Sequence, residues 1–301
     1  MPETLQDVTQ FPTTTRLTPL VHRVLGMNPA TFTGPGTNTY LVGAEGREPL
    51  LIDSGSGVPA WLELLRRHLA QHGLKAPARC LFTHAHGDHV GGMAQLRGAF
   101  PEIRFFKRPW PGRDPEPADR LDEGDEIHGE GYTLRAVHTP GHAPDHLCFL
   151  LEEERALFTG DVVLGVGTTV IPLEGGDLGM YLETLRRLQT LDLARIYPGH
   201  GPVIDAPREK VAYYLEHRLE RERQILALLA QGVQTVTDLV AHIYKNYPPA
   251  LHTAAGQSVL SHLIKLEREG RVRRQGDVLP RFLLCDSETP ASLPDTHSSA
   301  T

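Results

Sequence analysis

The segment Thr83–Gly91 constrains the chain most, because it holds three histidines and one aspartate within six positions. The preceding residues 78–82 are mostly apolar and predict a buried strand. Side chains two residues apart in an extended segment point to the same side, so His84 and His86 can bind one metal ion. A helix that begins near Asp88 would turn Asp88 and His89 toward a second position. The pattern predicts a metal site, and the alternative is a surface histidine cluster with Asp88 capping a helix.

Four more residues of metal-ligand type follow predicted strands elsewhere in the chain. Each stands shortly after a short apolar run. Loops at the ends of strands can gather side chains at one edge of a sheet without disturbing the core. We therefore expect these residues to join the histidine cluster. They are Asp53, His142, Asp161 and His200.

Composition limits the class of protein. The sequence holds no apolar run of the ~20 residues that a membrane-spanning helix needs, and residues 1–15 lack the basic-then-apolar pattern of a secretory leader. Three cysteines cannot all pair, and Cys80 and Cys148 lie in apolar strand-like stretches. These features predict reduced core cysteines and a cytoplasmic protein without a thiolate zinc site.

The elements around the cluster predict a mixed α/β region. Residues 101–131 contain five prolines and predict an irregular loop near the site. Lys107, Arg108 and Trp110 in this loop are candidate contacts for an anionic substrate, and the alternative is an ordinary solvated loop. The predicted strands are 21–24, 37–42, 50–52, 78–82, 132–137, 147–151, 156–158 and 194–197, and the predicted helices are 61–71, 92–98 and 180–191.

The C-terminal part has a different pattern. Residues 208–231, 236–244 and 250–269 predict three helices, and residues 271–284 predict a small hairpin. This order resembles a winged helix. Residues 208–284 carry a net charge of +4 although the whole chain carries −7, which favours a nucleic-acid contact or, equally, a solvated helical face. The Ser/Thr/Pro-rich residues 285–301 predict disorder.

The motif His84-x-His86-x-Asp88-His89, followed by Pro-Gly-His142, Thr-Gly-Asp161 and Pro-Gly-His200, resembles the signature of the metallo-β-lactamase superfamily. The resemblance implies an α/β fold, a four-layer αββα sandwich of two similar halves. The expected domains are a flexible N-terminus over 1–16, a catalytic domain over 17–207, a winged-helix-like domain over 208–284 and a disordered tail over 285–301.

The resemblance also implies a ligand set and a class of reaction. It implies a dinuclear metal-dependent hydrolase in which Asp88 and Asp161 are catalytic ligands. Nitrogen and carboxylate ligands suit two Zn²⁺ ions, and Mn²⁺ or Fe²⁺ are also compatible. Asp53 is expected to hold a ligating histidine from behind, or alternatively to cap the helix at 58–71. The first ion would be bound by His84, His86 and His142, the second by Asp88, His89 and His200, and Asp161 would bridge them.

The segments Gly36–Gly43 and Gly165–Thr169 resemble one branch of the superfamily, that of β-lactamase-like protein 2, which includes an endoribonuclease for single-stranded RNA. This branch suggests Asn38, Thr168 and Thr169 as substrate contacts. Gly87 departs from the branch, where a larger residue is frequent, and this affects the shape of the site mouth.

Three functions remain open at this point. Single-stranded RNA is the favoured substrate, because the chain most resembles the endoribonuclease branch and its C-terminal module is basic. An acyl thioester, for example one carried on an acyl carrier protein, is the alternative, because fungal members of the branch are thioesterases. A nucleic-acid or partner-binding module with structural metals is the third possibility, and the intact ligand set favours an enzyme over it.

Overall fold

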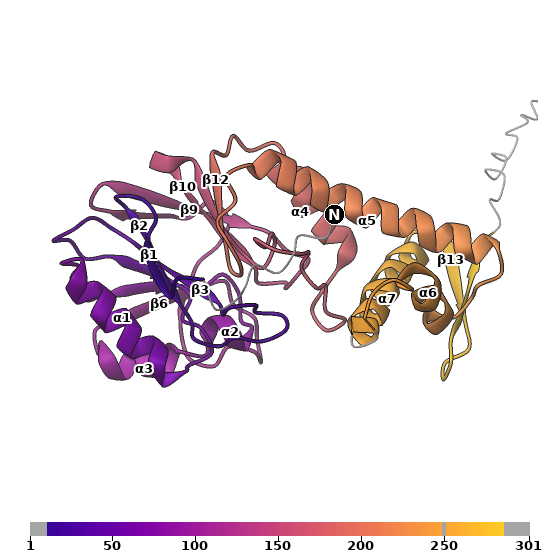
Figure 1. The fold of residues 1–301 in the computed structure, drawn as a ribbon, viewed down its shortest axis with the longest axis horizontal. Helices are drawn as coiled ribbons and strands as arrows, with labels where there is room; N and C mark the ends of the chain where they lie inside the picture. Colours follow the sequence, from indigo (N-terminus) through magenta and orange to yellow (C-terminus); the bar gives the residue numbers. More distant parts are fainter. Residues whose placement is uncertain (1–10, 249–250, 286–301) are drawn as a thin grey trace, which may run out of the picture. The chain divides into compact units, whose positions relative to one another are not determined.

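The computed structural model describes residues 11–248 and 251–285. Its internal contacts divide the chain into two units, residues 1–219 and 220–301. The division falls inside helix α5 (Pro207–Ala230; Figure 1). Residues 286–301 of the predicted tail and residues 1–10 of the predicted N-terminal segment lie outside the described residues.

The first unit contains a seven-stranded sheet in the order β1-β2-β3-β4-β5-β6-β7. Neighbours are antiparallel from β1 to β4 and parallel from β4 to β7. Residues 14–16 of the predicted N-terminal segment form strand β1. The strands are β1 (Thr14–Arg16), β2 (Val21–Leu25), β3 (Asn38–Val42), β4 (Leu50–Ile52), β5 (Arg79–Leu81), β6 (Arg104–Lys107) and β7 (Asp119–Arg120).

A second sheet has five strands in the order β12-β11-β10-β9-β8. Its neighbours are antiparallel except for the parallel pair β11 and β12. A 3₁₀ turn at Glu152–Glu154 joins β10 to β11. The strands are β8 (Glu126–Gly129), β9 (Tyr132–His138), β10 (Leu147–Leu151), β11 (Ala156–Gly160) and β12 (Arg195–Pro198).

Three hydrophobic cores separate four layers. Tyr40 and Phe158 belong to the core between the two sheets. Trp61 belongs to the core between the seven-stranded sheet and helices α1 (Pro59–Gln71) and α3 (Met93–Ala99). Tyr181 and Tyr214 belong to the core between the five-stranded sheet and helices α4 (Leu178–Leu188) and α5. This arrangement confirms the predicted αββα sandwich (Figure 1).

The prediction of an irregular loop over residues 101–131 was wrong. Strands β6, β7 and β8 lie in this stretch. β6 pairs in parallel with β5, with Phe105 opposite Cys80. β8 forms a hairpin with the neighbouring strand β9, but β6 and β7 are two to four residues long and pair with strands more distant in sequence. The local pattern does not contain that information.

The described part of the second unit is a small helical domain with a hairpin. It contains the end of α5, helix α6 (Val236–Ile243), helix α7 (His252–Arg268) and the antiparallel strands β13 (Val272–Gln275) and β14 (Arg281–Leu284). Ile225, Leu239, Leu263 and Phe282 share one buried core. This order confirms the predicted winged helix. Among the described residues, no helix has the length and apolar character needed to span a membrane.

Candidate metal centre

Loops that follow the strands of both sheets bring the predicted ligands to one edge. β4 and β5 are parallel neighbours, and so are β11 and β12, so the strands of each pair end at the same edge. A bridge between Thr37 and His200 joins the two sheets at this edge. The structure therefore brings all seven predicted ligand residues together. They are His84, His86, Asp88, His89, His142, Asp161 and His200.

Three histidines form the first group. His86 Nδ1 lies 2.9 Å from His84 Nε2 and 2.9 Å from His142 Nε2. Asp161 Oδ2 lies 3.6 Å from His142 Nε2. His84 and His142 are buried, and His86 is half-buried. The ring nitrogens therefore converge on one point from the loop after β5 and from the loop after β9.

Asp88, His89 and His200 form the second group. Asp88 Oδ2 lies 3.5 Å from His89 Nε2 and 3.2 Å from His200 Nε2. Asp161 Oδ1 lies 3.2 Å from each of the same two nitrogens. Since one oxygen of Asp161 faces this group and the other faces His142, Asp161 lies between the two groups. Short helix α2 (Gly87–Val90) provides Asp88 and His89.

These atoms fit a divalent metal. His89 Nε2 and Asp161 Oδ1 are buried and form no hydrogen bond among the described residues, although buried polar atoms normally have a partner. Burial lowers the pKa of His84 well below its usual value, and burial together with His142 lowers the pKa of His86 to about 4. Both imidazoles are therefore neutral at pH 7, as metal binding requires.

The acidic ligands keep their charge. Burial favours neutral Asp88, but His89 and a hydrogen bond from His200 outweigh it and lower the pKa of Asp88 to about 2. Burial likewise opposes the charged form of His200, but Asp161 and Asp88 raise its pKa to about 9. Metal binding at neutral pH must therefore displace protons from this group of residues.

Asp53 supports the centre from behind. Its Oδ1 accepts the Thr83 amide at 2.8 Å, and its Oδ2 accepts the Thr83 hydroxyl at 2.9 Å and His89 Nδ1–H at 2.8 Å. His89 Nε2 is thereby directed to the other ligands. Asp53 adopts a φ of 59°, a costly conformation for a non-glycine residue. Since the N-cap of α1 is Val58, Asp53 does not cap that helix.

The sequence reasoning missed His146. It is fully buried, and its Nε2 accepts the Asp161 amide at 3.1 Å. Nδ1 therefore carries the proton and donates to Thr139 Oγ1 at 2.9 Å. This contact fixes the backbone of Asp161. A signal existed in the sequence, because His146 stands four residues after His142 and directly before an apolar strand.

The three suggested substrate contacts lie close to the ligand loops. Asn38 is buried, and its amide nitrogen donates to the carbonyls of Pro198 and Gly201 at 2.9 and 2.8 Å. It thus holds the loop that carries His200. Thr169 is buried with its hydroxyl 3.3 Å from His142 Nδ1, and Thr168 is half-buried. Contact of these residues with a substrate stays a prediction.

The loop after β6 presents an indole to the centre. Lys107 is buried, where its Nζ binds Asp114 and lies 3.2 Å from Asp145 Oδ2, and Arg108 forms an ion pair with Asp122. Both cations are thus engaged within the protein. The ring of half-buried Trp110 lies 6.1 Å from the ring of His86, measured between centroids.

Comparison with known families agrees with this geometry. Residues 32–200 match the family model described as the metallo-beta-lactamase superfamily, and residues 235–281 match the beta-lactamase associated winged helix domain. The chain belongs to the metallo-beta-lactamase superfamily and is a metal-dependent hydrolase. Its fold implies that it binds divalent metal.

Individual relatives have more specific names than the family. An atrochrysone carboxyl ACP thioesterase of Aspergillus chevalieri is 41% identical over 288 residues, covering 91% of this chain and 90% of the relative. The lactamase-like protein adaB of Aspergillus niger is 38% identical, covering 90% and 87%. The specific resemblance to β-lactamase-like protein 2 is not confirmed by these relatives.

Solved structures support the fold. A metallo-beta-lactamase family protein from Thermus thermophilus aligns with a TM-score of 0.75 and 26% identity, covering 90% of this chain and 100% of that chain. A beta-lactamase domain protein from Burkholderia ambifaria aligns with a TM-score of 0.79 and 22% identity, covering 95% of each chain.

Proposed function

We propose that this protein hydrolyses acyl thioesters, such as an acyl group carried on an acyl carrier protein, with two divalent metal ions, Zn²⁺ first among them. The thioesterase name of a relative that is 41% identical supports this substrate class. The observation that carries the proposal is the neighbourhood of the metal ligands, where the loop after β6 places Trp110 beside His86 and the nearby cations Lys107 and Arg108 are held in ion pairs.

The acyl thioester alternative replaces single-stranded RNA, which was the favoured substrate prediction. An RNA site needs cations that follow the phosphate backbone, together with stacking groups. Lys107 and Arg108, the candidate cations near the centre, are occupied by Asp145 and Asp122. An indole without free cations suits an apolar acyl chain better than a polyanion.

Several cations of the second unit are also paired with carboxylates. Arg271 and Lys265 bind Glu222 at 2.8 and 2.7 Å. Arg274 binds Glu267 at 3.0 Å. Cations held by neighbouring carboxylates are less available to phosphate groups, so the excess of basic residues over 208–284 is a weak indicator of RNA binding.

In the proposed mechanism, each residue of the centre has a separate task. His84, His86 and His142 would hold one ion, Asp88, His89 and His200 the other, and Asp161 would bridge them. When bound, the ions supply Lewis acidity and lower the pKa of water toward ~7. Asp53 holds His89 in the tautomer that directs Nε2 inward, and His146 positions Asp161 through its backbone amide.

A panel of substrates tests the proposal. Zinc-loaded protein is incubated with an acyl-pantetheine thioester, an acyl-loaded carrier protein, unstructured RNA and single-stranded DNA. We expect cleavage of both thioesters, measured as free thiol, and no cut in either nucleic acid. The Asp161→Ala variant serves as the control for contaminating thioesterases.

Two outcomes would overturn the assignment. Metal-dependent cutting of RNA without release of thiol would restore the endoribonuclease prediction. Release of thiol at the same rate in Asp161→Ala would show that the metal centre does not perform the reaction.

A second prediction concerns Trp110. Replacing Trp110 with alanine should raise KM for a long-chain acyl thioester about tenfold, because the loss of a half-buried indole contact is worth about 1.4 kcal/mol. KM for an acetyl thioester should change little, since a two-carbon acyl group offers little apolar surface to the ring. Trp110→Phe keeps an aromatic ring and should retain most of the affinity. An equal rise in KM for both substrates would contradict the role of Trp110 in acyl recognition.

A further inference from the structure

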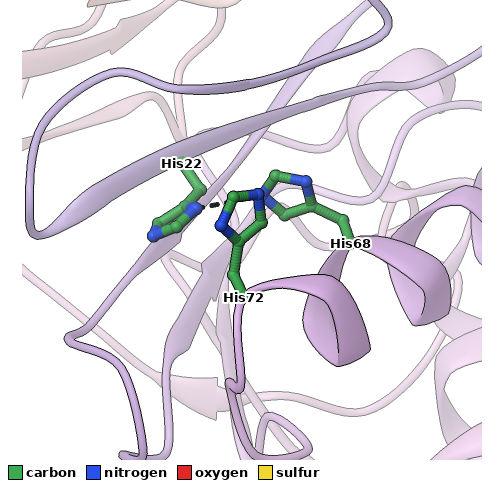
Figure 2. Close-up of side chains that lie close together, drawn as sticks. All are labelled: His22, His68 and His72. Carbon is green, nitrogen blue, oxygen red and sulfur yellow. Dashed lines mark hydrogen bonds between the residues drawn. The ribbon is translucent and has the colours of Figure 1, made fainter.

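A second histidine cluster lies apart from the metal centre. Figure 2 shows His22, His68 and His72 with their rings turned toward one another. His22 belongs to strand β2, His68 belongs to the last turn of helix α1, and His72 is the C-cap of that helix. The cluster therefore joins a helix to the sheet on which it packs.

The geometry resembles that of the first ligand group. His22 Nδ1 lies 3.0 Å from His68 Nε2, close to the 2.9 Å contacts of His86 in the metal centre. One nitrogen of each of the three rings lies within 4.8 Å of the others. Nitrogens bound tetrahedrally to zinc at about 2.0–2.1 Å are roughly 3.3 Å apart. An ion therefore needs only small side-chain movements to bind here.

The surroundings keep the rings in the form that binds metal. His22 and His68 are each 2% exposed. Burial, with contributions from the neighbouring histidines, lowers the pKa of both to about 4. Both are neutral at pH 7. Among the described residues, the facing nitrogens of His22 and His68 have only each other as a hydrogen-bond partner, and the second ring nitrogen of His68, Nδ1, is buried without one.

Two charges near the cluster have opposite effects on the binding of a cation. Arg16 faces His22 and opposes a cation. The C-terminal end of α1, where His68 and His72 stand, carries the negative pole of the helix dipole and favours one. His72 is half-exposed, so the cluster can be reached from solvent.

The cluster is separate from the catalytic edge. Helix α1 begins six residues after Asp53, which lies at that edge, and runs for 13 residues. A helix of this length spans about 20 Å. His68 and His72 lie at its far end, so the two groups of histidines do not share an ion.

We propose that His22, His68 and His72 form an additional binding site for a transition-metal ion of the Zn²⁺ class. Three imidazoles without a carboxylate suit zinc, copper or nickel and do not suit magnesium or calcium. A bound ion crosslinks β2 to the end of α1. It binds the folded state and therefore stabilises the first unit.

Counting bound ions tests this site. Protein stripped with a chelator is loaded with Zn²⁺, passed over a desalting column and analysed for zinc per chain. We expect His72→Ala to bind one ion fewer than the wild type and His68→Gln to show the same loss. His128→Ala removes an exposed histidine of β8 and should bind as many ions as the wild type.

Two further measurements keep the test independent of folding and of catalysis. Circular dichroism establishes that His72→Ala is folded, and its thioester hydrolysis should equal that of the wild type because the catalytic ligands are unchanged. In wild-type protein, the imidazole NMR signals of His22, His68 and His72 should shift together as zinc is added. Equal zinc content in wild type and His72→Ala, or no shift of these signals, would overturn the proposal.

Discussion

Replacing Asp161 with alanine should lower kcat for thioester hydrolysis by about a thousandfold or more. Asp161 is the only ligand residue whose two oxygens face both ligand groups among the described residues. Its loss would remove a charge that both ions need, and several kcal/mol of catalysis by metal correspond to three or more powers of ten in rate. Steady-state kinetics with an acyl-pantetheine thioester measures the effect.

The fold of the Asp161→Ala variant should survive, because this side chain serves the metal centre and not a hydrophobic core. A far-UV circular dichroism melt in the presence of chelator should be close to that of the metal-free wild type. Asp192→Ala is a suitable control, because Asp192 is an exposed aspartate that pairs only with Arg155 among the described residues. Activity of Asp161→Ala near the wild-type level would contradict the bridging role.

Removal of metal should abolish hydrolysis and lower the melting temperature of the first unit by roughly 10 °C. An ion that binds only the folded state at a thousand times its Kd stabilises that state by about 4 kcal/mol. For a unit of this size, each kcal/mol corresponds to roughly 2–4 °C. Differential scanning calorimetry before and after chelation measures the shift.

The proposed histidine site beside α1 would contribute to the same shift. The experiment is therefore done in the His72→Ala background, where the remaining stabilisation belongs to the catalytic centre. Adding Zn²⁺ back should restore both the melting temperature and the activity. A melting temperature that does not depend on metal in this background would show that the centre does not bind ions tightly.

Local strand and helix patterns predicted only a mixed α/β region, and the four-layer sandwich followed from the resemblance of the ligand motifs to the metallo-β-lactamase superfamily. The ligand spacing is a local feature, because His84 and His86 alternate in an extended segment that follows the mostly apolar residues 78–82. Strand β6 was missed because its hydrogen bonds come from β5, whose paired residues stand 25 positions earlier in the chain. The support of Asp161 by His146 was harder to predict, since the amide of Asp161 reaches His146 only after the second sheet has formed.

The substrate prediction shows a different limit of sequence reasoning. Counting Lys107 and Arg108 as available cations ignored their partners Asp145 and Asp122. The ion pair with Asp145 links residues 38 positions apart, and no charge count reveals it. The proposed role of Trp110 could not be predicted from the sequence for the same reason, because only the folded chain brings its ring close to His86.

The division of the ligands between the two sheets has a consequence for how the protein matures. Each ligand group takes two residues from the first half of the sandwich and one from the second, His142 in one group and His200 in the other. Neither half can therefore assemble either catalytic ion site while the other is still being synthesised or has been cut away. Tight metal uptake at the catalytic centre comes after long-range loop closure, so metal bound there reports that the two halves have docked correctly.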